Sequence, residues 1–347
     1  MPHRHGRGRG RAKYAGILAV GIALLAAATY VSLTDGAFDI PLRDVVKTLL
    51  RIAPNPDWDL VIFEFRLPRI VTALLVGAGL GIAGAVLQSV TRNGLADPGI
   101  LGINAGAGAA VVIFLYFFQG EVQGTGIFSV MAMPLFGLLG GLLAAVLIYL
   151  FSWHGGRLES QRLLLTGIAV GAGLSAISLF LTLRMNAGDF EMVAVWTSGS
   201  IYNANWLYIA AMLPWFALCV PLIWLQSRTL DLFHLDDDSI RSAGARSELQ
   251  KALLLLCGIG LVSACVSVSG GIGFVGLMAP HIARRLTGYS YRRILPTCAM
   301  IGALLVLAAD YIGRTAFAPS ELPVGMVIAI IGGPSFIYLW ARGRRSV

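Results

Sequence analysis

The residues of this sequence that could do chemistry are polar side chains set beside or inside long apolar runs. Arg66 and Arg69 flank a proline, and Gln88 lies near the end of the apolar run that follows. Asp310 lies inside a later run, four residues before Arg314. Such groups are costly in lipid unless they pair, line water or meet a partner. We expect Asp310 and Arg314 to pair on one helix face, whereas Gln88 could line a passage or hydrogen-bond across helices.

Motifs that would indicate an enzyme are absent. None of the three lysines, Lys13, Lys47 and Lys251, stands in the Gly-Lys-Ser/Thr sequence of a Walker A loop, and HExxH and GxSxG do not occur. The four cysteines lie inside apolar runs without CxxC spacing, so we interpret them as small buried hydrophobic residues. The sequence therefore predicts no catalytic residue, no metal site and no directly bound cofactor.

Composition indicates a polytopic membrane protein. The chain is 57% hydrophobic and 13% charged, with a mean hydropathy of +0.77, which excludes an ordinary soluble domain. The net charge of +8 does not indicate nucleic-acid binding, because the basic residues are scattered around apolar runs. Glycines recur four residues apart in several runs, which is typical of close helix packing. We expect close helix packing at Gly77, Gly81, Gly102 and Gly106. These helices could form the wall of a pathway, and Gln88 could line the same wall.

Nine apolar runs are long enough to cross a bilayer, which takes about 20 residues. They cover residues 15–33, 67–91, 99–118, 127–151, 161–184, 207–226, 249–268, 294–316 and 322–341. A tenth, shorter candidate covers residues 274–286 and cannot be assigned from hydropathy alone. The expected fold is therefore all-α, with about ten transmembrane helices.

The distribution of basic residues favours the ten-span topology. With ten crossings and the N-terminus inside, nineteen of the 26 lysines and arginines fall in inner segments and seven in outer segments. This bias orients membrane proteins, and nine crossings would place the basic C-terminus outside. We therefore expect a basic cytoplasmic leader at 1–14, one transmembrane domain at 15–342 with a cytoplasmic loop at 227–250, and a cytoplasmic tail at 343–347. A cleaved signal peptide fits less well, because the first run is long for one.

Six segments, in order, resemble the FecCD-type permeases, which are membrane subunits of type II ABC importers for iron(III) siderophores, haem and cobalamin. The similarity runs from about residue 15 to residue 342. The segments are RLPRIVTALLVGAGLGIAGAVLQ, RNGLADPGILGINAGAGA, QRLLLTGIAVG, SGGIGFVGLMAPHIARRLTG, LPTCAMIGALLVLAAD and ELPVGMVIAIIGGPSFIYLW.

The resemblance implies partners. It implies a second permease subunit, identical or not, and two cytoplasmic ABC ATPase subunits that use ATP and Mg. It also implies an extracytoplasmic substrate-binding protein and a place in the bacterial cytoplasmic membrane. In this family the binding protein docks through acidic side chains on arginines, which match Arg66, Arg69 and Arg314 here. The alternative is that these arginines snorkel to the interface or pair with Asp310.

The resemblance also implies an ATPase-coupling segment and an inner gate. The segment carries three aspartates that suit a helix N-terminus, and its residues are Leu235, Asp236, Asp237, Asp238, Ser239, Ile240, Arg241, Ala243, Gly244, Ala245 and Arg246. The gate matches Glu159, Ser160 and Gln161. Glu159 departs from the small hydroxyl residues of the family, and Gly94 departs from the proline usual before Leu95.

The substrate predicted from the resemblance is an iron(III)-siderophore complex, with haem and then cobalamin as alternatives. Two other classes stay open. An ion-coupled secondary transporter would contain discontinuous helices with buried carboxylates and would need no ATPase. A scaffold subunit without transport would tolerate changes at 235–246 and at the arginines.

Overall fold

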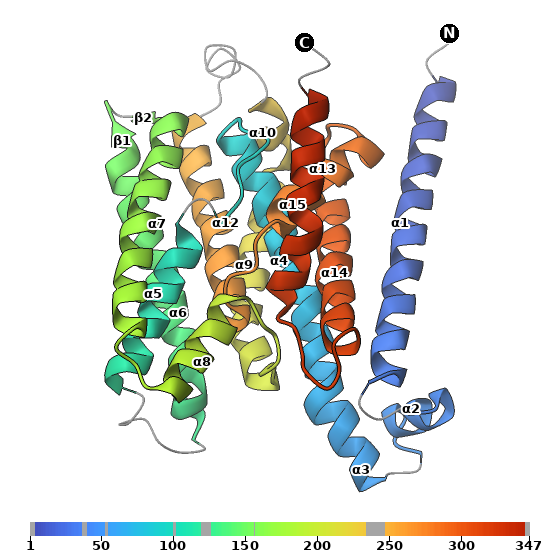
Figure 1. Ribbon diagram of the computed structural model, residues 1–347. Helices are drawn as coiled ribbons and strands as arrows, with labels where there is room; N and C mark the ends of the chain where they lie inside the picture. The colour runs from blue at the N-terminus through green and yellow to red at the C-terminus, as the bar shows by residue number, and fades with distance from the viewer. Residues whose placement is uncertain are drawn as a thin grey trace.

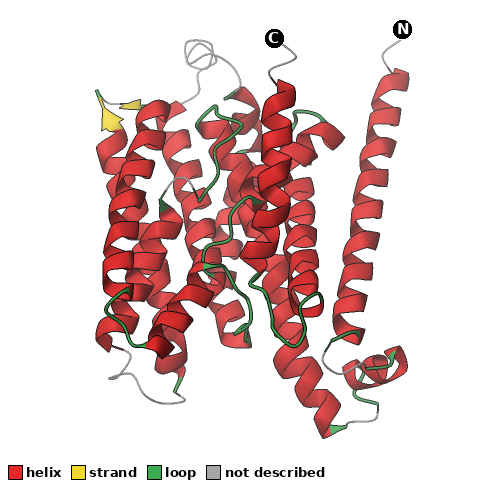
Figure 2. Ribbon diagram, viewed as in Figure 1, coloured by secondary structure: helices red, strands yellow, loops and turns green. Residues whose placement is uncertain are grey.

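The computed structural model is a bundle of helices that run mostly side by side (Figures 1 and 2). The structure describes residues 4–36, 40–52, 55–99, 102–118, 126–155, 157–233 and 247–343. Within these residues, seven helices are long and apolar enough to cross a membrane. They are α1 (Arg4–Thr34), α4 (Leu67–Val90), α6 (Ile127–Ser152), α7 (Ser160–Thr182), α9 (Trp206–Leu225), α12 (Ser247–Ser269) and α14 (Tyr291–Thr315).

Three shorter helices complete the bundle, and several small elements connect it. The shorter helices are α5 (Ile103–Phe118), α13 (Val275–Thr287) and α15 (Val324–Gly343). The connecting elements are α2 (Leu42–Leu49), α3 (Pro56–Asp59), the π-helical segment η1 (Leu60–Arg66), α8 (Ala187–Thr197), α10 (Ser227–Leu232) and the paired two-residue strands β1 (Trp153–His154) and β2 (Arg157–Leu158). The all-α prediction is confirmed, with one minimal hairpin added.

α1 begins and α15 ends at the same end of the bundle, together with α10 and the β1–β2 hairpin (Figure 1). We call this the terminal end and the opposite one, which carries α2, α3 and α8, the far end. A chain that starts and ends on the same side of a membrane crosses it an even number of times. The seven long and three shorter helices of the described chain agree with the prediction of about ten spans.

α13 was ambiguous from hydropathy because it does not span the bilayer alone. Its 13 residues rise about 20 Å, whereas the hydrocarbon core is about 30 Å thick. The chain before it, from Gly270 to Phe274, is not helical. Non-helical backbone is tolerated at membrane depth only where protein or a wet cavity surrounds it. Gly270 meets that condition, because it lies against the Trp196 carbonyl.

The helix that contains α4 starts well before the predicted span at 67–91. Asn55 caps α3 by accepting the Asp57 backbone N–H at 3.1 Å, and helical turns then continue through η1 into α4. The wider π-helical turns come directly before Pro68, whose ring cannot join an ordinary α-helical ladder. The amphipathic helix α2 and the short α8, capped by Asn186, were not predicted either.

Glycines bring the central helices into close contact. Gly77 lies against Gly302 of α14, Gly81 against Cys298 of the same helix, and Gly84 against Gly276 of α13. α4 is thereby buried between α14, α13 and α12. These approaches leave no room for a side chain at the three positions on α4.

A second glycine contact joins α5 to its neighbours. Gly106 faces Gly140 and Ala144 of α6, and Gly102 faces Gly167 and Gly171 of α7. Gly102 also has a left-handed backbone, with φ of +73°, which favours glycine. The predicted close packing at Gly77, Gly81, Gly102 and Gly106 is therefore observed, and Gly137 and Gly141, also four residues apart, face serines of α12.

Replacing Gly81 or Gly106 by leucine should damage the bundle. A Cβ atom at Gly106 would lie 2.6 Å from the Gly140 carbonyl oxygen, and one at Gly81 would overlap the Cys298 carbonyl. Overpacking of this kind costs about 1–3 kcal/mol, and backbone atoms cannot yield easily. We expect a lower yield of monodisperse protein and a lower melting temperature in detergent. Gly16→Leu, at a position on α1 with open space around it, is the matched control. Equal yields for all three variants would contradict the packing assignment.

Candidate functional site

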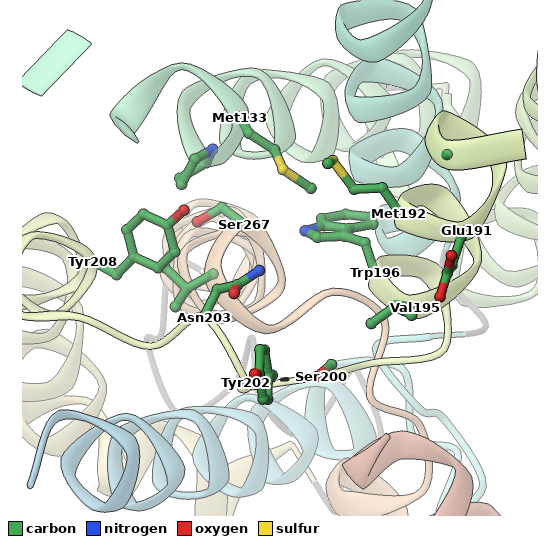
Figure 3. A pocket seen from close by; sticks show the side chains of 13 residues that line it. Met133, Glu191, Met192, Val195, Trp196, Ser200, Tyr202, Asn203, Tyr208 and Ser267 are labelled. Carbon is green, nitrogen blue, oxygen red and sulfur yellow. Dashed lines mark hydrogen bonds between the residues drawn. The ribbon is translucent and has the colours of Figure 1, made fainter. Parts of the chain in front are cut away.

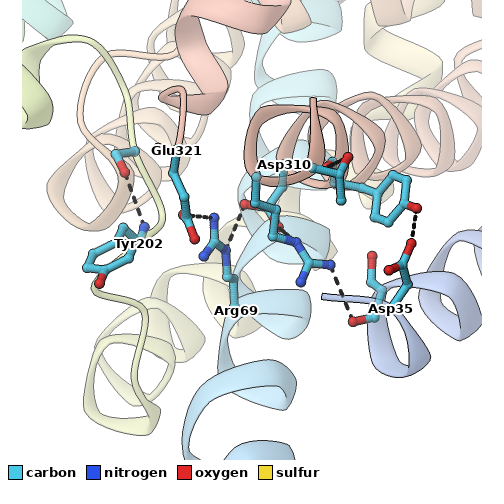
Figure 4. Close-up of polar contacts among 10 residues, drawn as sticks. Asp35, Arg69, Tyr202, Asp310 and Glu321 are labelled. Carbon is cyan, nitrogen blue, oxygen red and sulfur yellow. Dashed lines mark hydrogen bonds and ion pairs between the residues drawn. The ribbon is translucent and has the colours of Figure 1, made fainter. Parts of the chain in front are cut away.

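Five charged side chains gather at the far end of the bundle, and we call them the far-end cluster: Arg66, Arg69, Asp310, Arg314 and Glu321. η1 and the first turn of α4 supply two of the arginines, and the last turns of α14 supply Asp310 and Arg314. Glu321 lies in the loop between α14 and α15 (Figure 4). Together they line a cavity of about 600 Å³. The structure thus brings all three predicted docking arginines into one site.

Asp310 holds the far-end cluster together. Its Oδ1 lies 2.8 Å from Nε of Arg69, and its Oδ2 lies 3.5 Å from Nε of Arg314. The carboxylate is almost completely buried, with 1% of the side chain exposed. The expected Asp310–Arg314 pair is present, but Arg69 is the nearer partner. Residue spacing could not reveal that partner, because 241 residues separate it from Asp310.

The cluster also reaches α1 and the loop before α15. Arg66 donates to the Leu33 carbonyl, Arg314 donates to the Ser32 carbonyl at 3.3 Å, and the Tyr311 hydroxyl donates to Asp35. Arg69 Nη2 lies 2.8 Å from Oε2 of Glu321. The far ends of α1, α4 and α14 and the loop before α15 are therefore tied by charged side chains.

Exposure differs sharply within the cluster. Arg66 is buried, although the docking expectation assigned it to an outward-facing contact. The side chains of Arg314 and Arg69 are 12% and 17% exposed, whereas that of Glu321 is 35% exposed. Glu321 is therefore the most accessible charged side chain of the cluster.

A second cavity lies beside the cluster, between α6, α8, α9 and the end of α12 (Figure 3). It has a volume of about 320 Å³, and its lining includes the aromatic and thioether side chains of Trp196, Met133, Met192 and Tyr208. Tyr202, from the chain between α8 and α9, lines this cavity and also lies under the Arg69 guanidinium, 5.8 Å from the ring centre. The two far-end cavities are thus neighbours.

Gln88 hydrogen-bonds across helices. Its Nε2 donates to the Gly276 carbonyl at 3.1 Å, and its Oε1 accepts from Nη2 of Arg284 at 2.5 Å. The side chain is buried. Gln88 therefore joins α4 to α13 at two points, which is one of the two roles that the sequence left open.

The polar turn after α4 supports the start of α13. Asp97 accepts the Phe274 backbone N–H at 3.0 Å and the Gly99 N–H at 3.4 Å. Burial raises the pKa of the Asp97 carboxyl, while these two hydrogen bonds act in the opposite direction. Phe274 has a left-handed backbone, with φ of 65°, so the Asp97 contact holds a residue in a sparsely populated conformation.

The predicted gate residues lie at the terminal end, where α7 begins. Glu159 precedes the first residue of α7 and pairs with Arg162 at 2.6 Å. Glu159 and Ser160 line a polar cavity of about 290 Å³ that also includes Glu248. Gln161 follows on α7 and is exposed, and it does not line that cavity. The three residues are therefore neighbours on the chain that face different surroundings.

Glu248 links the start of α12 to the start of α7. Its Oε2 accepts the Leu158 backbone N–H at 3.2 Å, and its Oε1 lies 3.2 Å from Nζ of Lys251. Lys251 is buried, whereas a quarter of the Glu248 side chain is exposed, so water reaches the pair from the glutamate side. No local sequence pattern predicts this contact, because about 90 residues separate its two sides.

The predicted coupling residues, Leu235 to Arg246, lie outside the described residues. The described chain on either side differs from the predicted loop at 227–250. α10 occupies 227–232 on one side, and α12 begins at Ser247 on the other.

A bundle of membrane-length helices with buried, paired charges at one end and a polar cavity at the other is an α-helical membrane protein that crosses the bilayer several times. The chain belongs to the FecCD transport family, whose profile matches residues 24–342. It is therefore a transport component that spans the membrane several times.

Relatives and a solved structure agree with this assignment. The chain is 52% identical over 325 residues to the iron-uptake system permease protein FeuC of Bacillus subtilis (strain 168), with 94% of this chain and 97% of that protein covered. It is 45% identical to the iron(3+)-hydroxamate import system permease protein FhuG of the same organism, covering 93% and 96%. A metal-chelate type ABC transporter in an inward-facing conformation superposes with a TM-score of 0.81 at 29% identity, covering 94% and 99%.

Replacing Asp310 by asparagine should strongly destabilise the bundle. The substitution removes the carboxylate that two largely buried guanidinium groups share. Breaking a buried pair from one side costs about 3–5 kcal/mol. We expect a clear drop in the melting temperature of the purified protein. Asp44→Asn, which removes an exposed partner 4.0 Å from Lys47, should change it little. Equal melting temperatures for the two variants would mean that the Asp310 pairs contribute nothing.

Proposed function

We propose that this chain is the permease subunit of an ATP-driven importer of iron(III)-siderophore complexes in a bacterial cytoplasmic membrane. The observation that carries the proposal is 52% identity along nearly the whole chain to a protein named an iron-uptake permease. The similarity to an iron(3+)-hydroxamate permease supports a siderophore as the iron carrier. The terminal end would face the cytoplasm, in line with the excess of basic residues in the predicted inner segments.

The energy would come from partner subunits. This chain has no Walker A sequence, so ATP and Mg would be used by two cytoplasmic ABC ATPases, and the permease itself would bind no cofactor. The ATPases would bind the permease through residues 235–246. A second permease subunit would complete the translocation pathway. α12 begins directly after that segment, and Glu248 contacts the chain just before α7. This contact supports transmission of ATPase movement to Glu159, Ser160 and Gln161.

The far-end cluster would receive the extracytoplasmic binding protein. Arg69 and Arg314 present partly exposed guanidinium groups in one cavity, and Arg66 adds a third positive charge beneath them. Acidic side chains of a partner are the complementary chemistry. Charges placed in this way mainly control the association rate and its dependence on salt.

Transport in proteoliposomes tests the energy source. We expect uptake of a radiolabelled ferric siderophore only when the complete complex contains catalytically competent ATPases. A complex with ATPases mutated in their catalytic glutamate should give no uptake, because this chain carries no Walker A sequence with which to replace them. Scrambling residues 235–246 should abolish uptake while leaving the permease folded. Uptake that persists in either case would contradict the ABC importer assignment and favour an ion-coupled transporter.

A charge-neutral double variant tests the docking role of Arg69. Arg69→Gln alone would leave Asp310 short of its nearest partner, so we combine it with Asp310→Asn, which removes both charges of that pair. Arg314 also loses its carboxylate partner in this variant, so docking is measured well below the variant's own melting temperature. Binding-protein affinity should fall about tenfold, with a weaker dependence on salt, because a contact for an acidic side chain is lost. Affinity and association rate can be measured on nanodiscs by biolayer interferometry.

The control for this variant is Arg184→Gln, which removes an exposed positive charge just beyond the far-end terminus of α7. It should leave the affinity nearly unchanged. An equal loss in the control and in the double variant would assign docking to the general charge of the far end rather than to the cluster.

A further inference from the structure

Glu321 lies where a carboxylate from outside would contact Arg69. Its Oε2 is 2.8 Å from Nη2 of Arg69, while Asp310 holds the Nε edge of the same guanidinium at 2.8 Å. Asp310 is enclosed by the bundle, whereas Glu321 is the most exposed member of the far-end cluster. The two carboxylates therefore occupy a buried edge and an accessible edge of one arginine.

The far-end cavity is also neutral overall. Three arginines line it, and so do three acidic residues, Asp35, Asp310 and Glu321. A neutral cavity gives a further carboxylate little electrostatic gain unless an internal one makes way. Asp310 cannot leave without stranding buried guanidinium groups. Exposed ion pairs are weak, so Glu321 is the carboxylate most easily displaced.

We infer that Glu321 is an internal competitor for the docking position, and that an acidic side chain of the partner binds Arg69 by displacing it. This inference rests on the docking role in the proposed function. The carboxylate chemistry of the partner belongs to the proposed function, and the inference adds the internal competitor and the contested atom, Nη2 of Arg69. The affinity of docking would then be set partly by a residue of the permease itself.

Displacement of Glu321 would also reach α15. Glu321 lies in the loop whose Leu322 N–H donates to the Gly313 carbonyl, at 2.9 Å, and α15 starts at Val324. Gly325 in turn donates to the Gly199 carbonyl at 2.9 Å, in the segment after α8. Release of the Glu321 contact would remove the charged tether between this loop and α4. Docking at the surface would thereby act on the start of a membrane helix.

Binding measurements on Glu321→Gln test the inference. Two probes are used on the protein in nanodiscs: the substrate-binding protein of the proposed importer, and an acetylated hexaglutamate peptide with hexaglutamine as its blank. Both acidic probes should bind about fivefold more tightly to Glu321→Gln than to the parent protein. Glu321→Asp keeps the charge on a shorter side chain, so its affinity for each probe should lie between those of the parent protein and of Glu321→Gln. Unchanged or weaker binding by the peptide would overturn the inference.

Glu64→Gln is the matched control, because Glu64 is an exposed glutamate of η1 at the same end. It should alter binding of either probe little, and tightening equal to that of Glu321→Gln would assign the effect to net charge and overturn the inference. A melting temperature within error of the parent protein verifies that each variant is folded. If the binding protein fails to dock on the parent protein, the proposed function fails at this point. The peptide series still decides the role of Glu321.

Discussion

The buried carboxylate of Asp310 is the constraint on which the far end of this protein depends. A charge with 1% of its surface exposed, on a helix that crosses a membrane, must be neutralised locally. Arg69 and Arg314 do so from two helices, and their remaining donors extend to Ser32 and Glu321. One carboxylate thus fixes how α4 and α14 meet, and through its partners it fixes the end of α1 and the approach to α15.

Backbone contacts do the corresponding work inside the bundle. Gly77, Gly81 and Gly84 let α4 touch α14 and α13 directly, where a side chain would push them apart. α13 is too short to cross the bilayer, and its start is held by Asp97 and by Gln88 bonding to Gly276. The polar residues of the segment from Arg66 to Ala107 therefore serve two purposes. Those at the far end can meet a partner, and those nearer the terminal end position a helix too short to cross the bilayer alone.

Much of this arrangement could be predicted from the sequence, because hydropathy, charge and glycine spacing are local patterns. They predicted the spans closely and identified α13 from the sign of the C-terminal charge. The partners of Asp310 and Glu248 could not be predicted, since each contact joins segments far apart in the chain. The burial of Arg66 and the competing position of Glu321 depend on how α1 and the loop before α15 fold over α4. α2 and α8 were missed because short connecting helices lack a membrane-length apolar run.

The most direct test of this account is a cryo-EM map of the chain assembled with its partners in a nanodisc. The account predicts an ATPase pair at the terminal end, in contact with residues 235–246, and a binding protein over the far-end cluster, with a partner carboxylate on Arg69 and Asp310 still buried beneath it. A map in which the ATPases contact other segments, or in which the binding protein leaves the far-end cluster uncovered, would contradict it.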